Sequence, residues 1–69
     1  MALVMTRLRR QRGWSQSKLA READLNQVTV SAVETGRLIP YDIQLAKLAK
    51  ALGVDPSRAA ELMRVVGEG

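Results

Sequence analysis

Short side chains without charge form one face of a helix predicted between residues 26 and 36. Its members are Gln27, Val28, Thr29, Ser31 and Ala32. Val30 and Val33 fall on the opposite face at helical spacing and are expected to point into a core. An amide can pair with adenine through two hydrogen bonds, hydroxyls reach base edges or phosphates, and small apolar groups can touch a thymine methyl. The face is therefore suited to a close approach to DNA, although an ordinary weakly polar helix surface would explain its composition equally well.

Side chains that carry acid–base or nucleophilic catalysis are scarce in this chain. It contains no histidine and no cysteine, which excludes disulfides, thiolate chemistry and the usual zinc sites. No paired carboxylates fall in a recognisable pocket, so a nucleophile and its base are hard to assemble. We therefore expect no enzyme activity, no cofactor, no metal and no small-molecule substrate.

Basic residues outnumber acidic ones only in the first half of the sequence. The formal net charge is +4, and residues 1–37 contain seven Lys or Arg against three Asp or Glu, whereas residues 38–69 contain four of each. This asymmetry is consistent with a half that faces a polyanion, and also with a solvated surface. The apolar run at the N-terminus is too short for a signal peptide or a membrane span, so we expect a cytoplasmic protein with no membrane partner.

Apolar residues recur at helical spacing over nearly the whole chain, and no segment alternates with period two over the length of a strand. The 69 residues therefore predict a single all-α domain over residues 1–69, with a folded core over about residues 3–66. The expected helices lie within residues 3–12, from 15 to about 23, from 26 to 35, from 41 or 42 to 52, and from 55 onward.

Capping residues mark several of these helix ends. Ser15 and Asn26 can cap helices with their side-chain oxygens, and Trp14 can form a hydrophobic staple with Leu19 that covers the core. The third helix begins about three residues after the second ends, so the two must cross at a steep angle. Asp55 is expected to cap the last helix, with proline at its first position.

Several short motifs follow one another in a characteristic order. They are RRQRGWSQ (9–16), the apolar and small positions Leu19, Ala20, Ala23, Leu25, Val30 and Val33, ETGR (34–37), Pro40, and LAKLAKALGV (45–54). Over about residues 3–60 this order resembles the lambda-repressor and Cro-like family, often called XRE-type regulators. The resemblance implies a compact five-helix domain whose helices 2 and 3 form a helix-turn-helix, with helix 3 in the major groove of DNA.

The resemblance also implies roles for individual residues. The base-reading positions would be Gln27, Val28 and Ala32. The residues near DNA phosphates would be Gln16, Thr29, Thr35 and Arg37. Gln16 would in addition brace Gln27, although an ordinary first-turn residue at 16 and a solvated loop cation at 37 are the simpler alternatives.

Two further positions follow from the same resemblance. Arg9 and Glu34 would form a largely buried ion pair that joins helix 1 to the end of helix 3. Asp24 stands where relatives usually have glycine in the turn, and an aspartate there adopts a left-handed conformation at a cost of roughly 1 kcal/mol or more.

The function implied is a sequence-specific, double-stranded DNA-binding transcriptional regulator of bacterial or phage type, acting as a repressor or autoregulator. We expect a homodimer on a two-fold symmetric operator, because one short recognition helix contacts too few base pairs to single out a site. The candidate dimer surface is the last predicted helix with the loop before it, where Leu62, Met63 and Val66 can extend the apolar stripe beyond what one subunit needs. The alternative is a non-enzymatic protein-interaction adaptor built on the same fold, which should show little salt-dependent binding to random duplex DNA.

Overall fold

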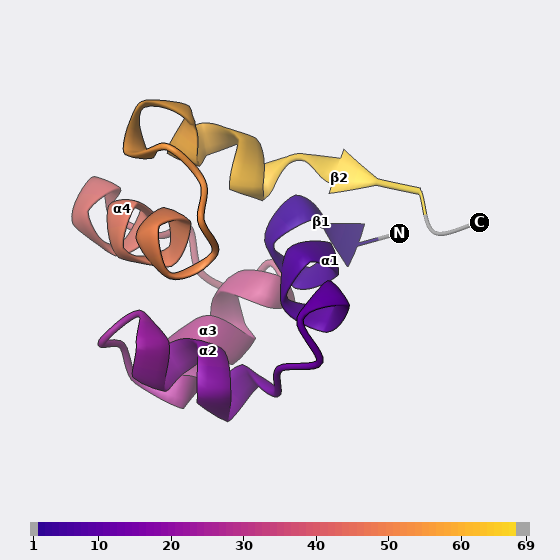
Figure 1. Cartoon of the computed structure of the whole chain (residues 1–69), viewed down its shortest axis with the longest axis vertical. Helices are drawn as coiled ribbons and strands as arrows, with labels where there is room; N and C mark the ends of the chain where they lie inside the picture. Colours follow the sequence, from indigo (N-terminus) through magenta and orange to yellow (C-terminus); the bar gives the residue numbers. More distant parts are fainter. Residues whose placement is uncertain (1, 68–69) are drawn as a thin grey trace.

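The computed structural model describes residues 2–67, which form four α-helices, one 3-10 helix and two short strands. In chain order they are β1 (Ala2–Leu3), α1 (Val4–Gln11), α2 (Gln16–Glu22), α3 (Gln27–Glu34), α4 (Asp42–Ala51), η1 (Pro56–Met63) and β2 (Val65–Val66). Figure 1 shows α2 and α3 together at one end of the molecule and η1 at the other, with α1 and α4 between them. The predicted all-α fold with five helices is confirmed. None of the helices within residues 2–67 has the length and apolar character needed to cross a membrane.

The helices begin and end where their capping residues predict. The side-chain oxygens of Ser15 and Asn26 accept backbone N–H groups from the first turns of α2 and α3, at 3.1 and 2.8 Å. Asp55 caps η1 in the same way at 2.9 Å. Gly36 follows α3 with a φ of 78°, a left-handed conformation that glycine adopts without a steric penalty.

The turn between α2 and α3 depends on one left-handed residue. Asp24 has a φ of 55°, and the next residue, Leu25, donates its backbone N–H to the carbonyl of Ala20 at 2.8 Å. The carboxylate of Asp24 lies 3.6 Å from Lys47 Nζ on α4, where the Asp24 side chain is almost fully exposed and the Lys47 side chain is 40% exposed. This tight turn reverses the chain and places α3 across α2.

The hydrophobic core is shared by all five helices. Its fully buried large side chains are Met5, Leu19, Val30, Val33, Leu48 and Leu62. Val30 and Val33 therefore anchor α3 on its inner face, as the helical spacing predicts. Trp14 is half-buried and packs against this core beside the start of α2. Because α3 is held from within, its opposite face is the one left for contacts with other molecules.

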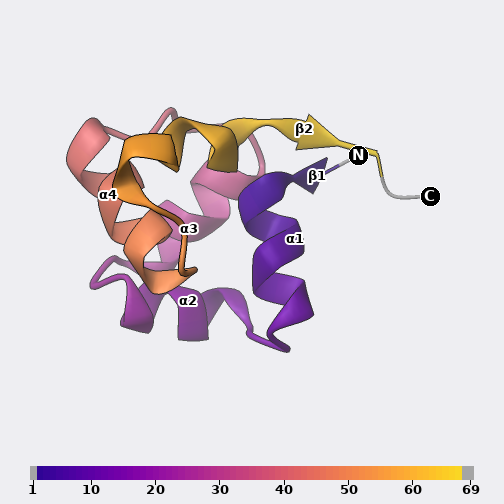
Figure 2. The same ribbon diagram turned by 45° about the horizontal axis from the view of Figure 1, so that its top comes forward.

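The C-terminal segment differs from the sequence prediction in two respects. The last helix is of the 3-10 type, with a non-helical Arg58, and it ends at Met63. Val66 was expected on this helix but lies in β2, which pairs antiparallel with β1 (Figure 2). The prediction of a chain without strands is therefore wrong at residues 2–3 and 65–66, because these two segments pair with each other as antiparallel strands. Leu62 is fully buried in the core and cannot extend a dimer surface, so that part of the prediction is also wrong.

Candidate nucleic-acid interface

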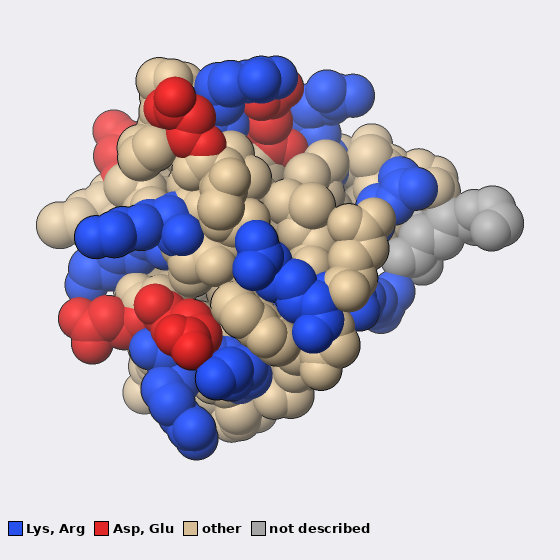
Figure 3. Space-filling view, in the orientation of Figure 1, with Lys and Arg blue, Asp and Glu red and all other residues tan. Residues whose placement is uncertain are grey.

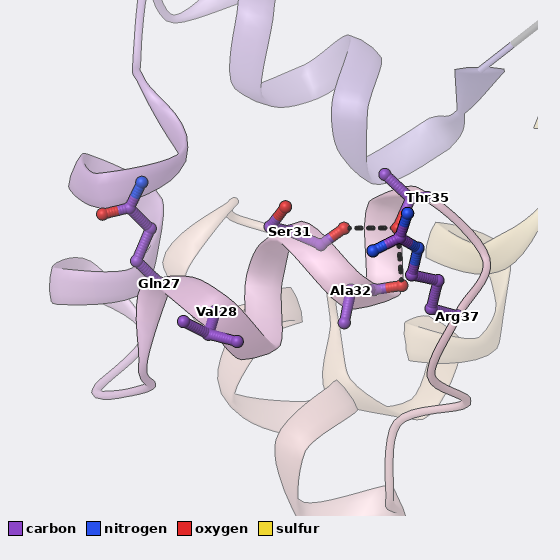
Figure 4. A pocket seen from close by; sticks show the side chains of 6 residues that line it. All are labelled: Gln27, Val28, Ser31, Ala32, Thr35 and Arg37. Atoms are coloured by element: carbon purple, nitrogen blue, oxygen red, sulfur yellow. Dashed lines mark hydrogen bonds between the residues drawn. The ribbon is translucent and has the colours of Figure 1, made fainter.

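The exposed face of α3 forms an open hollow of about 420 Å³ together with the residues that follow the helix. Its lining consists of Gln27, Val28, Ser31, Ala32, Thr35 and Arg37. Figure 4 shows Gln27 at one end of this surface and Arg37 at the other, with the small side chains between them. The side chains predicted to read bases therefore share one face with the cationic side chain predicted to hold a phosphate.

The middle of this face carries little steric bulk. Val28 is 74% exposed, whereas Val30, two residues later, is fully buried. The Thr35 hydroxyl donates back to the carbonyl oxygens of Ser31 and Ala32, at 2.9 and 3.2 Å, as the dashed lines in Figure 4 mark. Because no long side chain stands between the two ends, a flat or convex partner can approach the helix backbone closely.

Behind this face, Arg9 and Glu34 form the ion pair that the resemblance implies. Arg9 Nε donates to Glu34 Oε2 at 2.8 Å and Arg9 Nη2 donates to Oε1 at 3.1 Å, with side chains only 11% and 5% exposed. The remaining Arg9 Nη1 donates to the carbonyl oxygen of Trp14 at 2.7 Å. Such a two-pronged arginine–carboxylate pair is directional as well as attractive, so it fixes the end of α3 against α1 and the start of α2.

Gln16 belongs to the same network. Its Nε2 donates to Glu34 Oε1 at 2.9 Å. The expectation that Gln16 braces Gln27 is not met, because a partly buried carboxylate is the stronger acceptor for the amide. The contact to Gln27 comes instead from Ser17, whose hydroxyl donates to Gln27 Oε1 at 2.6 Å.

Among the other predicted contacts, Thr29 is half-buried and does not line the hollow. The sequence placed Ser31 on the uncharged face of α3 but assigned it no DNA contact, and it did not point to Ser17. Ser31 lies four residues after Gln27, so helical spacing was enough to put both on one face. Ser17 lies on a different helix, and only the crossing of α2 over α3 brings it to Gln27.

Figure 3 shows Lys and Arg side chains spread across one face of the molecule, with Asp and Glu toward its left side and top.

Trp14 packs against the core and does not line the hollow. The Arg12 guanidinium lies 5.1 Å from the centre of the Trp14 ring and donates to the Leu52 carbonyl at 2.9 Å. Trp14 thus packs as a cover of the core. Within residues 2–67, no cluster of three or more His, Cys, Asp or Glu side chains is arranged to hold a metal ion.

Comparison with known proteins gives one match. A family model described as helix-turn-helix matches residues 5–58, a range that runs from α1 into η1. No curated protein and no solved structure matches the chain. The matched range contains the whole lining of the hollow and all members of the Arg9–Glu34 network.

Proposed function

The chain belongs to the helix-turn-helix family of the XRE and lambda-repressor-like type, and from that premise we propose that it is a sequence-specific transcriptional regulator. In this proposal it binds double-stranded DNA as a homodimer, reads the major groove with α3, and acts as a repressor or autoregulator in the cytoplasm. The observation that carries the proposal is the exposed face of α3, where uncharged short side chains end at Arg37.

The dimensions of α3 explain how the bases would be read. The major groove is about 12 Å wide, close to the diameter of a helix with its side chains, so short side chains let the helix backbone come close to the bases. Gln27 stands at the first position of α3, where its amide can reach hydrogen-bonding atoms on a base edge. Val28 and Ala32 would contact thymine methyl groups or reject bulkier edges beside it.

Phosphate contacts would hold the helix in register. Arg37, in the loop after α3, is exposed and would pair with a backbone phosphate beside the groove. Thr35 would turn its hydroxyl from the carbonyls of its own helix toward a phosphate oxygen. Gln16 and Thr29, in the first turns of α2 and α3, would make further contacts to phosphates.

A second copy of the chain is the proposed partner on DNA, because an eight-residue recognition helix spans too few base pairs. Large apolar side chains are also exposed between α3 and the first turn of α4, namely Ile39, Tyr41 and Ile43, at 86%, 73% and 69% exposure. We propose a two-fold contact at this segment, which follows α3 in the chain and would bring the α3 helices of two copies onto the same DNA. The domain measures 31 × 24 × 23 Å, which is compatible with half-site centres about 34 to 36 Å apart.

Selection of duplexes from a random pool, followed by titrations at several salt concentrations, tests the proposal. Gln27→Ala should cost about 1 to 3 kcal/mol on the selected site and relax preference at one or two positions, with the salt slope nearly unchanged. Arg37→Ala should weaken all duplexes alike and lower the salt slope by about one for each phosphate that it no longer neutralises. Gln11→Ala and Arg64→Ala, exposed residues of the same types outside the hollow, are the matched controls.

The outcomes separate DNA binding from the adaptor function. Absence of salt-dependent binding to any duplex would refute the proposal and favour a protein-interaction adaptor. Equal losses of affinity for Gln27→Ala on every sequence would show that α3 does not read bases.

Analytical ultracentrifugation at micromolar concentration tests the dimer. The wild-type chain should associate, and replacement of both Ile39 and Ile43 by serine should weaken this association. The control Val65→Ser should leave it unchanged. A wild-type chain that stays monomeric both free and on DNA would refute the dimer.

A further inference from the structure

The hydroxyl of Ser17 holds one end of the Gln27 amide. Ser17 is the second residue of α2 and Gln27 is the first residue of α3, and both are exposed where the two helices meet. Ser17 Oγ donates to Gln27 Oε1 at 2.6 Å. Ser17 does not cap its helix, since Ser15 does so, and the core does not need its side chain.

From this contact we infer that Ser17 is a positioning residue that determines which base can lie opposite Gln27, an inference that rests on the proposed function. With Oε1 turned toward Ser17, the Nε2 hydrogens of Gln27 are left to point outward as donors. Adenine, guanine and thymine all present an acceptor in the major groove, at N7, O6 or O4. Cytosine presents only its N4 amino group, a donor, so it is the base rejected at this position.

The Ser17 hydroxyl is needed because the two ends of a glutamine amide have nearly the same shape. Rotation by about 180° around the last side-chain torsion exchanges oxygen and nitrogen and turns a donor into an acceptor. In the rotated orientation Nε2 would face Ser17 Oγ, and a separation of 2.6 Å is ordinary for an O–H···O bond but short for an N–H···O bond, so the hydroxyl favours the observed orientation. Without Ser17 the amide can adopt both orientations, and the rotated one accepts a hydrogen bond from cytosine N4. Adenine stays favourable with or without the hydroxyl, because Nε2 can donate to its N7.

Binding to four versions of the selected site, each with a different base opposite Gln27, tests this role. Wild-type protein should bind the cytosine version most weakly. Ser17→Ala should reduce discrimination against cytosine by about 3- to 10-fold, the range that one neutral hydrogen bond supports. Ser17→Thr, which keeps the hydroxyl, should restore it, and Ser17→Ala should change no preference in a Gln27→Ala background.

Three results would overturn the inference while leaving the proposed function intact. They are a wild-type preference for cytosine at this position, full discrimination in Ser17→Ala, and an equal effect of Ser17→Ala when Gln27 is already alanine. Failure of the wild-type chain to select any sequence would instead refute the proposed function, and the specificity role of Ser17 with it.

A measurement without DNA checks the contact itself. In the free protein, ¹⁵N relaxation of the Gln27 side-chain amide should show restricted motion that increases in Ser17→Ala and returns in Ser17→Thr. Equal mobility in all three proteins would show that Ser17 does not hold the amide, and would overturn the inference whatever the DNA experiment gives.

Discussion

Removal of the Glu34 carboxylate should lower the free energy of unfolding more than truncation of any other side chain outside the apolar core. In Glu34→Ala, the Arg9 guanidinium loses its two carboxylate bonds at Nε and Nη2, and only the bond from Nη1 to the Trp14 carbonyl remains. Gln16 Nε2 loses its acceptor in the same step. A cation that is nearly nine-tenths buried would then have no counter-charge at hydrogen-bond distance.

The expected loss is roughly 3 to 5 kcal/mol, because stranding one member of a buried pair costs its full desolvation. A domain of this length has a total stability of about 3 to 10 kcal/mol, so the change removes a large share of it. At about 4 to 8 °C per kcal/mol for a domain of this size, the Tm should fall by roughly 12 to 40 °C. Glu34→Gln, which keeps an acceptor oxygen and the side-chain shape, should cost less.

Urea unfolding followed by circular dichroism and by the fluorescence of Trp14, the single tryptophan, measures this loss. Glu22→Ala is the matched control, since its partner Lys18 lies at 3.1 Å but both side chains are more than 40% exposed. An exposed pair of this spacing contributes about 0.3 to 0.5 kcal/mol. A Glu34→Ala loss as small as that of Glu22→Ala, with an unchanged denaturant slope, would refute the argument. If Glu34→Ala does not fold, Gln16→Ala with an expected loss of about 1 kcal/mol keeps the network testable.

Three further predictions concern the turn, the cap of η1 and the operator. Asp24→Gly should leave the free energy of unfolding in urea unchanged or raise it by up to about 1 kcal/mol, because relief of the left-handed strain outweighs loss of the exposed ion pair with Lys47. A clear decrease in the free energy of unfolding would contradict this. The pKa of Asp55 is lowered below 3.8, first by the Ser57 backbone N–H and then by its hydroxyl, so the capping contribution is present above about pH 4 and is lost as pH falls through the lowered value. Asp55→Asn should therefore flatten the stability curve between pH 2 and 5, and an NMR titration of Asp55 at or above 3.8 would be incompatible with the cap. On DNA, half-sites about 10 to 10.5 bp apart should bind most tightly, and a five-base-pair insertion that leaves affinity unchanged would argue against a rigid dimer.

Local chemistry in the sequence was sufficient for the helices up to α4 and for the outer face of α3, whereas the roles proposed for individual site residues came from the resemblance. Ser15 and Asn26 each cap a helix through a hydrogen bond two or three residues along the chain, so their effect is readable without the fold. The periodicity of Val30 and Val33 likewise predicted the inner face of α3, and thereby the outer one. The pairing of Arg9 with Glu34 came from the resemblance, because nothing in spacing alone connects residues 25 positions apart.

Contacts between distant segments were decided only by the tertiary structure. The pairing of β1 with β2 joins the two ends of the chain, and two-residue strands carry no alternation that a sequence pattern could reveal. Leu62 shows the same dependence, since a helical stripe predicts which side chains share a face but not how deeply the neighbouring helices cover each of them. Gln16 and Ser17 are adjacent and polar, and the sequence does not show which residue of α3 each of them contacts. The angle at which α2 crosses α3 turns Gln16 toward Glu34 and Ser17 toward Gln27, and that angle depends on the packing of the whole core.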